Sequence, residues 1–189
     1  MKNPSTNEFL SDIKFFDLLL EQFKWDDGEL PTSIAYLTQA MNEDYPPRKA
    51  SLVRIAREKL RNSDTLGSIL LMISRGKTGP LPGRVDRRQF EKFLANKGVS
   101  KEKYGAGLAS LSDVAMSAGS GSSPKNLYHL DPRKYLHANI IVEEKQIITY
   151  EKLVSMTTDS NFVSALNSVQ ARQIQHRDEF VDMLRRLDR

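Results

Sequence analysis

Apolar residues recur every three or four positions along most of this chain, which is the spacing of residues on one face of a helix. The pattern covers residues 7–23, 27–75 and 132–187. Pro46 and Pro47 divide the second of these ranges, because a proline inside a helix removes a backbone donor and clashes with the preceding turn. No stretch shows the strict alternation of a half-buried strand. The sequence therefore predicts an all-α fold.

The same spacing predicts which side chains face the core. The expected core residues of the first helices are Phe9, Ile13, Phe16 and Leu20, then Leu30, Ile34, Leu37 and Met41, and then Leu52, Ile55, Leu66, Ile69 and Ile73. Asp27 precedes a proline, Pro31, in the opening turn of the second helix. This arrangement predicts that Asp27 caps that helix.

Residues 77–130 differ in kind from the rest of the chain. A short helix is predicted over residues 85–98, whereas residues 105–124 are small, polar and rich in glycine and serine. The second segment is expected to be an irregular crossover, serving either as a flexible connection or as a contact between subunits. Two helices, a long crossover and two further helices predict a ferritin-like four-helix bundle with an added N-terminal helix, in one domain over residues 1–189.

Composition limits the class of protein further. The chain has no cysteine, so disulfides and thiolate chemistry are excluded. Its 28 basic and 24 acidic residues give a dispersed net charge of +4, so nucleic acid is not expected as a partner. With no run of 18 apolar residues and no signal-peptide pattern at the start, we expect a cytoplasmic protein without a membrane segment.

One member of the apolar stripe between residues 136 and 154 is a glutamate. The stripe consists of Leu136, Ile140, Glu143, Ile147, Tyr150 and Val154. A helix that buries this face also buries the carboxylate of Glu143, where an unpaired charge is costly. Either one buried pair or protonation compensates it, or the carboxylate is a metal ligand in the bundle.

Other helices carry polar residues in their stripes too. Lys59 and Asn62 interrupt the stripe that contains Leu52 and Leu66, while Gln173 and His176 interrupt the stripe of the last helix. Residues three apart are neighbours on one helix face. Glu29 and Glu58 lie at the edges of their stripes. Because each predicted bundle helix offers polar groups at a corresponding place, we predict one shared polar centre rather than separate buried pairs.

Three segments resemble a known family. The segment "LLEQFKWDDGELPTSIAYLTQAM", with Gly28, Glu29, Tyr36, Leu37 and Gln39, is similar to the start of the manganese catalases and of the related spore-coat proteins. The segments "IVEEKQIITY" and "QIQHRDEF" resemble the second pair of site helices in that family. The resemblance implies a ferritin-like fold, assembly into oligomers, and an oxygen-bridged dimanganese site that disproportionates hydrogen peroxide with three glutamates and two histidines.

The ligand positions of that family are only partly filled. The resemblance places Glu29, Glu143 and His176 on ligand positions, but it places Lys59 and Asn62 where a glutamate and a histidine are expected. Glu58, next to Lys59, is a further candidate ligand that would need the helix to rotate. Gln173 and Tyr36 are expected beside the ligands rather than among them.

Two functions follow from these replacements. In the first, the ammonium of Lys59 pairs with Glu29 and Glu143 in place of a metal. The chain is then a non-catalytic structural or assembly subunit without a cofactor, working as a homo-oligomer or with a protein partner. In the alternative, Glu29, Glu143 and His176, joined by Glu58, hold one or two manganese or iron ions in a peroxide-handling oxidoreductase.

Overall fold

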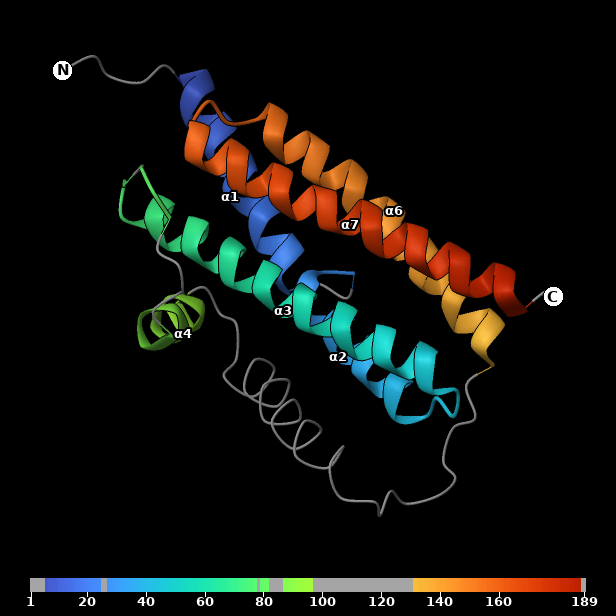
Figure 1. Cartoon of the computed structure of the whole chain (residues 1–189). Coiled ribbons are helices and arrows are strands. Elements are labelled where there is room, and N and C mark those ends of the chain that lie inside the picture. The colour runs from blue at the N-terminus through green and yellow to red at the C-terminus, as the bar shows by residue number, and fades with distance from the viewer. Residues whose placement is uncertain (1–5, 25–26, 78, 82–86, 97–130, 188–189) are drawn as a thin grey trace.

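The structure is a computed structural model of the whole chain, shown in Figure 1. It describes residues 6–24, 27–77, 79–81, 87–96 and 131–187. These residues form α1 (Thr6–Lys24), α2 (Glu29–Met41), α3 (Pro46–Ser74), α4 (Arg87–Asn96), α6 (Pro132–Ser155) and α7 (Ser160–Leu187). No strand occurs in the described ranges. The predicted all-α, ferritin-like bundle is confirmed.

The bundle consists of two helix pairs. α2 packs along α3, and α6 packs along α7, while α3 also contacts α7. α1 lies across one end and contacts α2, α3 and α6 (Figure 1). The short helix α4 packs against α3. The predicted irregular segment at residues 105–124 lies outside the described residues.

Local signals set the helix ends. The side chain of Asp131 accepts a hydrogen bond from the backbone N–H of Arg133 at 3.0 Å, with Pro132 in the first turn of α6. Asp159 does the same for α7, accepting from the N–H of Asn161 at 2.8 Å. After α3, Gly76 adopts a positive φ of 61°, a conformation that favours glycine.

The predicted cap of α2 is wrong. The residue that precedes α2 is Gly28, which makes no side-chain cap. The carboxylate of Asp27 instead accepts from Lys145 Nζ of α6 at 3.1 Å. Asp27 therefore ties the start of α2 to α6 rather than to the N–H groups of its own helix.

Two predicted core residues are also exposed. The exposed fraction of Ile13 is 42% and that of Met41 is 45%. The buried residues of α1 are Phe15, Leu19, Leu20 and Phe23. Phe16, also predicted to face the core, is only partly buried and packs edge-on against Phe93 of α4, with ring centroids 5.9 Å apart. The core face of α1 is thus rotated from the predicted stripe, because α1 must cover the end of the bundle and also receive α4. The side chain of Phe9 lies outside the described residues.

The apolar core divides into two clusters, one toward each end of the bundle. The first cluster contains Leu66, Ile69, Leu70, Tyr150, Leu166 and Val169 together with the buried residues of α1. The second contains Tyr36, Leu52, Ile55, Leu136 and Phe180. Polar side chains fill the bundle between the two clusters, where the apolar stripes of the sequence are interrupted.

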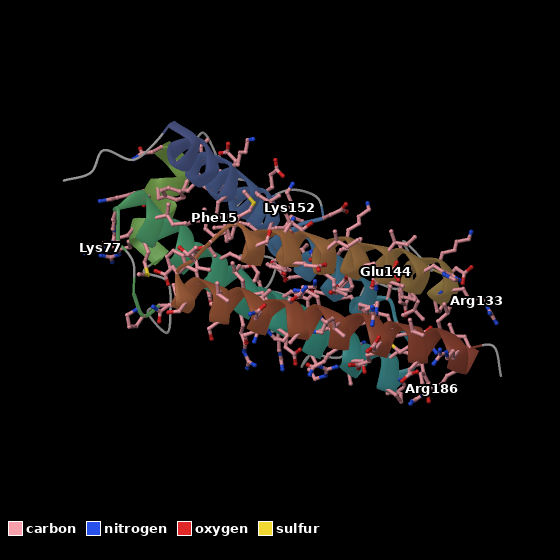
Figure 2. All side chains as sticks on the ribbon, turned by 90° about the horizontal axis from the view of Figure 1, so that it is seen from above. Phe15, Lys77, Arg133, Glu144, Lys152 and Arg186 are labelled. Carbon is pink, nitrogen blue, oxygen red and sulfur yellow. The ribbon has the colours of Figure 1, made fainter. Side chains whose placement is uncertain are left out.

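Figure 2 shows the charged side chains on the outer surface of the helices, with Glu144 and Lys152 on the exposed face of α6. Within the described residues, no helix combines the length and the apolar character that crossing a membrane requires. Most charged side chains thus lie on the outer surface of the bundle, and one group of polar side chains lies at the middle of its core.

Candidate polar centre

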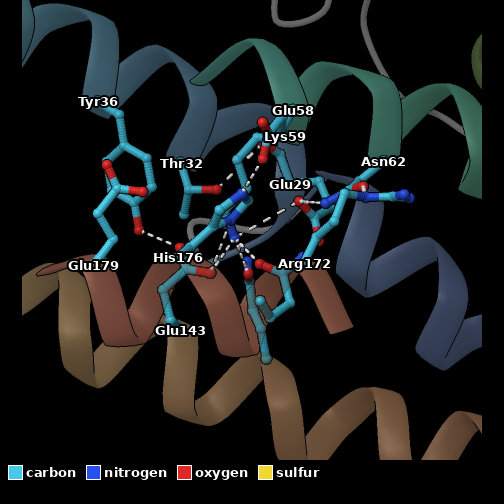
Figure 3. Close-up of polar contacts among 12 residues, drawn as sticks. Glu29, Thr32, Tyr36, Glu58, Lys59, Asn62, Glu143, Arg172, His176 and Glu179 are labelled. Atoms are coloured by element: carbon cyan, nitrogen blue, oxygen red, sulfur yellow. Dashed lines mark hydrogen bonds and ion pairs between the residues drawn. The ribbon is translucent and has the colours of Figure 1, made fainter. Parts of the chain in front are cut away.

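The centre lies among α2, α3, α6 and α7, and Figure 3 shows its contacts. Its members have no more than 1% exposed surface, and they are Glu29, Tyr36, Lys59, Asn62, Glu143, Gln146, Tyr150, Gln173 and His176. Buried polar groups are tolerated only when hydrogen bonds or ion pairs satisfy them. Each buried polar group of the centre therefore calls for a hydrogen-bond or ion-pair partner.

The ammonium of Lys59 lies at the middle of the centre. Its Nζ atom donates to Glu143 Oε2 at 2.8 Å, to Gln146 Oε1 and to Gln173 Oε1. A lysine ammonium carries three protons, so these three acceptors satisfy it. A fourth oxygen atom, Glu29 Oε2, lies 3.7 Å from Nζ, within ion-pair distance. One cation therefore lies between two buried carboxylates.

Glu143 is the closer counter-ion. The hydroxyl of Tyr36 donates to its Oε1 atom at 2.6 Å, and Lys59 donates to its Oε2 atom. Burial alone would raise the pKa of Glu143, but the charges of Lys59 and His176, together with the hydrogen bond from Lys59, outweigh it and hold that pKa below its ordinary value. Glu143 is the carboxylate that the centre holds in its charged form.

Glu29 has a different balance. It accepts from Tyr150 Oη and Gln173 Nε2, both at 2.6 Å, and from Asn62 Nδ2 at 3.2 Å. Burial nevertheless raises the pKa of Glu29 above its ordinary value, because it outweighs the charge of Lys59 and these hydrogen bonds. The two carboxylates are thus unequal, although each is fully buried.

His176 connects the centre to the surface. Its Nε2 atom is 2.8 Å from Glu58 Oε2, and its Nδ1 atom is 3.5 Å from Glu143 Oε2 without a hydrogen bond. Glu58 is partly exposed and also accepts from Arg54, which bridges to Glu179. Although burial would raise it, the pKa of Glu58 is below its ordinary value because of hydrogen bonds from His176 and Arg54.

A second link to the surface passes through Asn62. Its Oδ1 atom accepts from Arg172 Nε at 2.6 Å, while its Nδ2 atom donates to Glu29. Arg172 is partly buried on α7 and also donates to Ser168 at 3.2 Å. The amide of Asn62 thus has partners at both ends, and α3 is joined to α2 and α7 by one side chain.

The two helix pairs use the same spacing for their carboxylate and tyrosine. Tyr36 follows Glu29 in α2 at the distance at which Tyr150 follows Glu143 in α6. Each tyrosine donates to the glutamate of the other pair, in both cases at 2.6 Å. Helix α3 then supplies Lys59 where α7 supplies Gln173 at the corresponding spacing. The centre is therefore an internal repeat with unequal residues at its middle.

The predicted site residues do meet. The structure brings together Glu29, Lys59, Asn62, Glu143 and His176. Glu29, predicted at the edge of its stripe, is instead fully buried. Gln173 and Tyr36 lie beside this group and donate to its carboxylates. Glu58 lies at its outer edge and contacts His176 rather than the carboxylates.

Two members of the centre, Gln146 and Tyr150, were not predicted as polar site residues. Gln146 accepts from Lys59, and Tyr150, predicted as a core residue, donates to Glu29. Gln146 lies three residues after Glu143, a spacing that places both on one helix face. Tyr150 follows Glu143 at the same spacing as Tyr36 follows Glu29. Because Tyr36 was predicted beside the site, this equal spacing could have placed Tyr150 there too.

These donors do not fit a metal ion. Among the residues that the structure describes, no three His, Asp or Glu side chains lie in an arrangement that could hold one. The ammonium of Lys59 lies against the oxygen atoms that a cation would need, and a second cation beside it would be repelled. The carboxylate oxygens also accept from tyrosine and amide donors. The centre is closed by its own side chains.

Helix order, the two packed pairs and a polar centre between two apolar clusters define a ferritin-like bundle. Over residues 10–189 the chain matches the family described as manganese containing catalase, and it belongs to that family. It is also similar to the crystal structure of KatB, a manganese catalase from Anabaena PCC7120. That match has 24% identity and a TM-score of 0.62, and it covers 100% of this chain and 76% of KatB. No curated protein matches the chain.

Proposed function

We propose that this chain is a non-catalytic member of the manganese catalase family, in which the ammonium of Lys59 takes the place of metal. The observation that supports this most strongly is the position of Lys59 Nζ, which is fully buried, 2.8 Å from Glu143 and 3.7 Å from Glu29. A cation fixed to the chain balances the buried carboxylates in every molecule. No cofactor is needed for that purpose.

The chemistry of the replaced residues supports the same proposal. Peroxide disproportionation at a dimanganese site needs ions that change oxidation state, and carboxylates do most of the work of neutralising them. Lys59 and Asn62 offer neither a carboxylate nor an imidazole at the two replaced positions. Lysine, asparagine and glutamine cannot themselves cycle electrons with peroxide. The centre instead joins α2, α3, α6 and α7 through charge-assisted hydrogen bonds.

The proposed role is structural, as a homo-oligomer or as a subunit of a protein assembly. Ile141 and Ile148 lie seven residues apart on α6 and are 52% and 66% exposed, and Ile174 of α7 is 37% exposed. Residues seven apart lie on one helix face. Large exposed apolar side chains of this kind are common at subunit interfaces. They support the assembly role, with a second copy of the chain as the simplest partner.

Elemental analysis of the purified protein, counted per chain, tests the proposal. We expect no stoichiometric manganese or iron, and background oxygen evolution from hydrogen peroxide after manganese loading. One or two ions per chain with rapid peroxide turnover would instead establish a peroxide-handling oxidoreductase.

Light scattering after size exclusion tests the assembly role separately. The native chain should have the mass of an oligomer, and Ile148→Glu should lower that mass, because a charge would be buried at the interface. The exposed residue Lys49, changed to glutamine, provides a control on α3, in the other helix pair. A native monomer would contradict self-assembly.

A further inference from the structure

The amide groups of Gln146 and Gln173 are held in a fixed orientation. Gln146 Nε2 donates to the backbone carbonyl of Asp27 at 2.5 Å, and Gln173 Nε2 donates to Glu29 Oε1 at 2.6 Å. Because each nitrogen has an acceptor of its own, each Oε1 atom must point the other way. Both oxygen atoms point at Lys59 Nζ.

Partners other than the lysine also fix the orientation of these oxygens. Asp27 and Glu29 hold Gln146 and Gln173 from the start of α2, while Tyr36 holds Glu143 through its Oε1 atom at 2.6 Å. The three oxygens around Nζ are Glu143 Oε2, Gln146 Oε1 and Gln173 Oε1, and we name this set the oxygen cradle. The cradle is therefore built from α6 and α7 and is pre-arranged for a cation.

We propose that the oxygen cradle is a binding site for an ammonium-type monovalent cation, which Lys59 fills in the native chain. Without the Lys59 side chain, the cradle binds a free alkylammonium ion in preference to manganese. This inference rests on the proposed function, because it takes Lys59 as the replacement for metal. It goes beyond that function because it assigns the preference for ammonium over manganese to the neutral amide oxygens of Gln146 and Gln173.

The donor chemistry explains the preference. An ammonium group needs as many hydrogen-bond acceptors as it has protons, and neutral amide oxygens serve as well as carboxylates. A manganese ion prefers several carboxylate or imidazole ligands, which neutralise its charge. The cradle offers one carboxylate oxygen and two amide oxygens, with Glu29 Oε2 outside it at 3.7 Å from Nζ. That set matches a single positive charge better than a double one.

Lys59→Ala provides the test, because the atoms that it removes beyond Cβ correspond to propylammonium. Thermal melts at constant ionic strength compare propylammonium, 1-propanol, tetramethylammonium and manganese chloride. We expect propylammonium to raise the melting temperature of the variant with the logarithm of its concentration above Kd, by about 5 °C at a tenfold excess over Kd. The other three should have no such effect. Equal stabilisation by 1-propanol, or greater stabilisation by manganese, would overturn the inference.

Two further variants complete the design. Lys59→Met fills the space with apolar atoms, so propylammonium should not raise its melting temperature. Adding Gln146→Leu to Lys59→Ala removes an acceptor, and the response to propylammonium should fall at least about tenfold in apparent affinity. An unchanged response in that double variant would contradict the role of Gln146.

If Lys59→Ala does not fold in buffer, refolding is compared with propylammonium and with manganese. Folding with propylammonium alone supports the cradle, and folding with manganese alone or with neither overturns it. Metal analysis of the native chain is independent of these melts. A native chain that contains manganese would contradict the proposed function, whereas failure of rescue beside a metal-free native chain would contradict only the cation site.

Discussion

The first helix pair, α2 and α3, and the second, α6 and α7, are built to the same pattern but contribute different chemistry to the centre. Each pair contributes a fully buried glutamate and a tyrosine that donates across to the glutamate of the other pair. The pairs differ in the polar residues of their second helices, α3 and α7. α3 contributes Lys59 and Asn62, where α7 contributes Gln173 and His176.

The difference shows that two helices with the same apolar packing can hold different polar groups at the middle of one centre. The apolar residues that precede these polar residues are fully buried in both helix pairs, with Leu52 and Ile55 in α3 and Leu166 and Val169 in α7. Lys59 keeps its stem within the same packing and replaces only the charge at the middle. A helix face can therefore carry a lysine in place of a neutral amide without changing its apolar neighbours.

Removal of the Lys59 charge should be the most damaging single change. Lys59→Met keeps most of the volume but leaves Glu143 and Glu29 without a cation, and breaking a buried pair typically costs about 3 to 5 kcal/mol. Denaturant unfolding gives the free energy directly. The matched control is Lys49→Met, at an exposed position of the same helix, which should change that free energy by less than about 0.5 kcal/mol. If the two variants were equally stable, Lys59 would not be the counter-ion.

The two glutamates should respond unequally. Glu143→Gln removes the closer counter-ion of Lys59 and should cost about 3 kcal/mol, whereas Glu29→Gln should cost about 1 kcal/mol or less. The reason is that the pKa of Glu143 lies below its ordinary value of 4.5 and that of Glu29 lies above it. Urea unfolding at neutral pH measures both, and a larger loss in Glu29→Gln would reverse the assignment.

The pH dependence of unfolding sharpens this comparison. A lowered pKa in the folded state means that Glu143 contributes stability above pH 4.5, which is lost as the pH falls through the folded pKa. A raised pKa means that Glu29 contributes stability below pH 4.5, which is lost as the pH rises through its folded pKa. Glu143→Gln should therefore flatten the acid side of the stability profile. Glu29→Gln should remove the loss of stability that occurs as the pH rises through the folded pKa of Glu29. Stability profiles identical to the native one would contradict both assignments.

Much of this arrangement could be predicted from the sequence because helical periodicity is a strong signal in long helices. Lys59 and Glu143 were visible as polar interruptions of otherwise apolar stripes. Gln146 was not, because the predicted stripe continues from Glu143 to Ile147, and only the contact with Lys59 selects the neighbouring position. Ile13 was misplaced for a related reason, since the buried face of α1 depends on the helices it covers.

A manganese response should be recoverable in the first helix pair. Lys59→Glu together with Asn62→His supplies the two residue types that the resemblance to manganese catalases predicts there. Manganese that binds only the folded state would stabilise this variant by about 2.7 kcal/mol at a hundredfold excess over its Kd. Thermal melts with and without manganese measure the effect. The native chain is the control, and a melting temperature that climbs equally in both would mean that Lys59 does not close the centre.

The crossed tyrosines test whether the internal repeat holds in energy as well as in geometry. Tyr36→Phe and Tyr150→Phe each remove one 2.6 Å hydrogen bond to a buried carboxylate. Each should cost about 1 to 3 kcal/mol, because a buried acceptor loses a donor. Denaturant unfolding of the two variants, with Tyr45→Phe as an exposed control, measures the values. A loss confined to one tyrosine would show that only one half of the repeat carries the centre.

The smallest effect is expected at the surface end of the His176 contact. Arg54 bridges Glu58 and Glu179, but its side chain is 48% exposed, and solvent screens such pairs. Arg54→Ala should therefore cost less than about 1 kcal/mol, well below the cost of losing Lys59. High salt should reduce that cost further, while the Lys59→Met penalty should persist, since buried pairs are screened much less. Unfolding at low and high sodium chloride measures both. A salt-sensitive Lys59 penalty would place water inside the centre and contradict its closure.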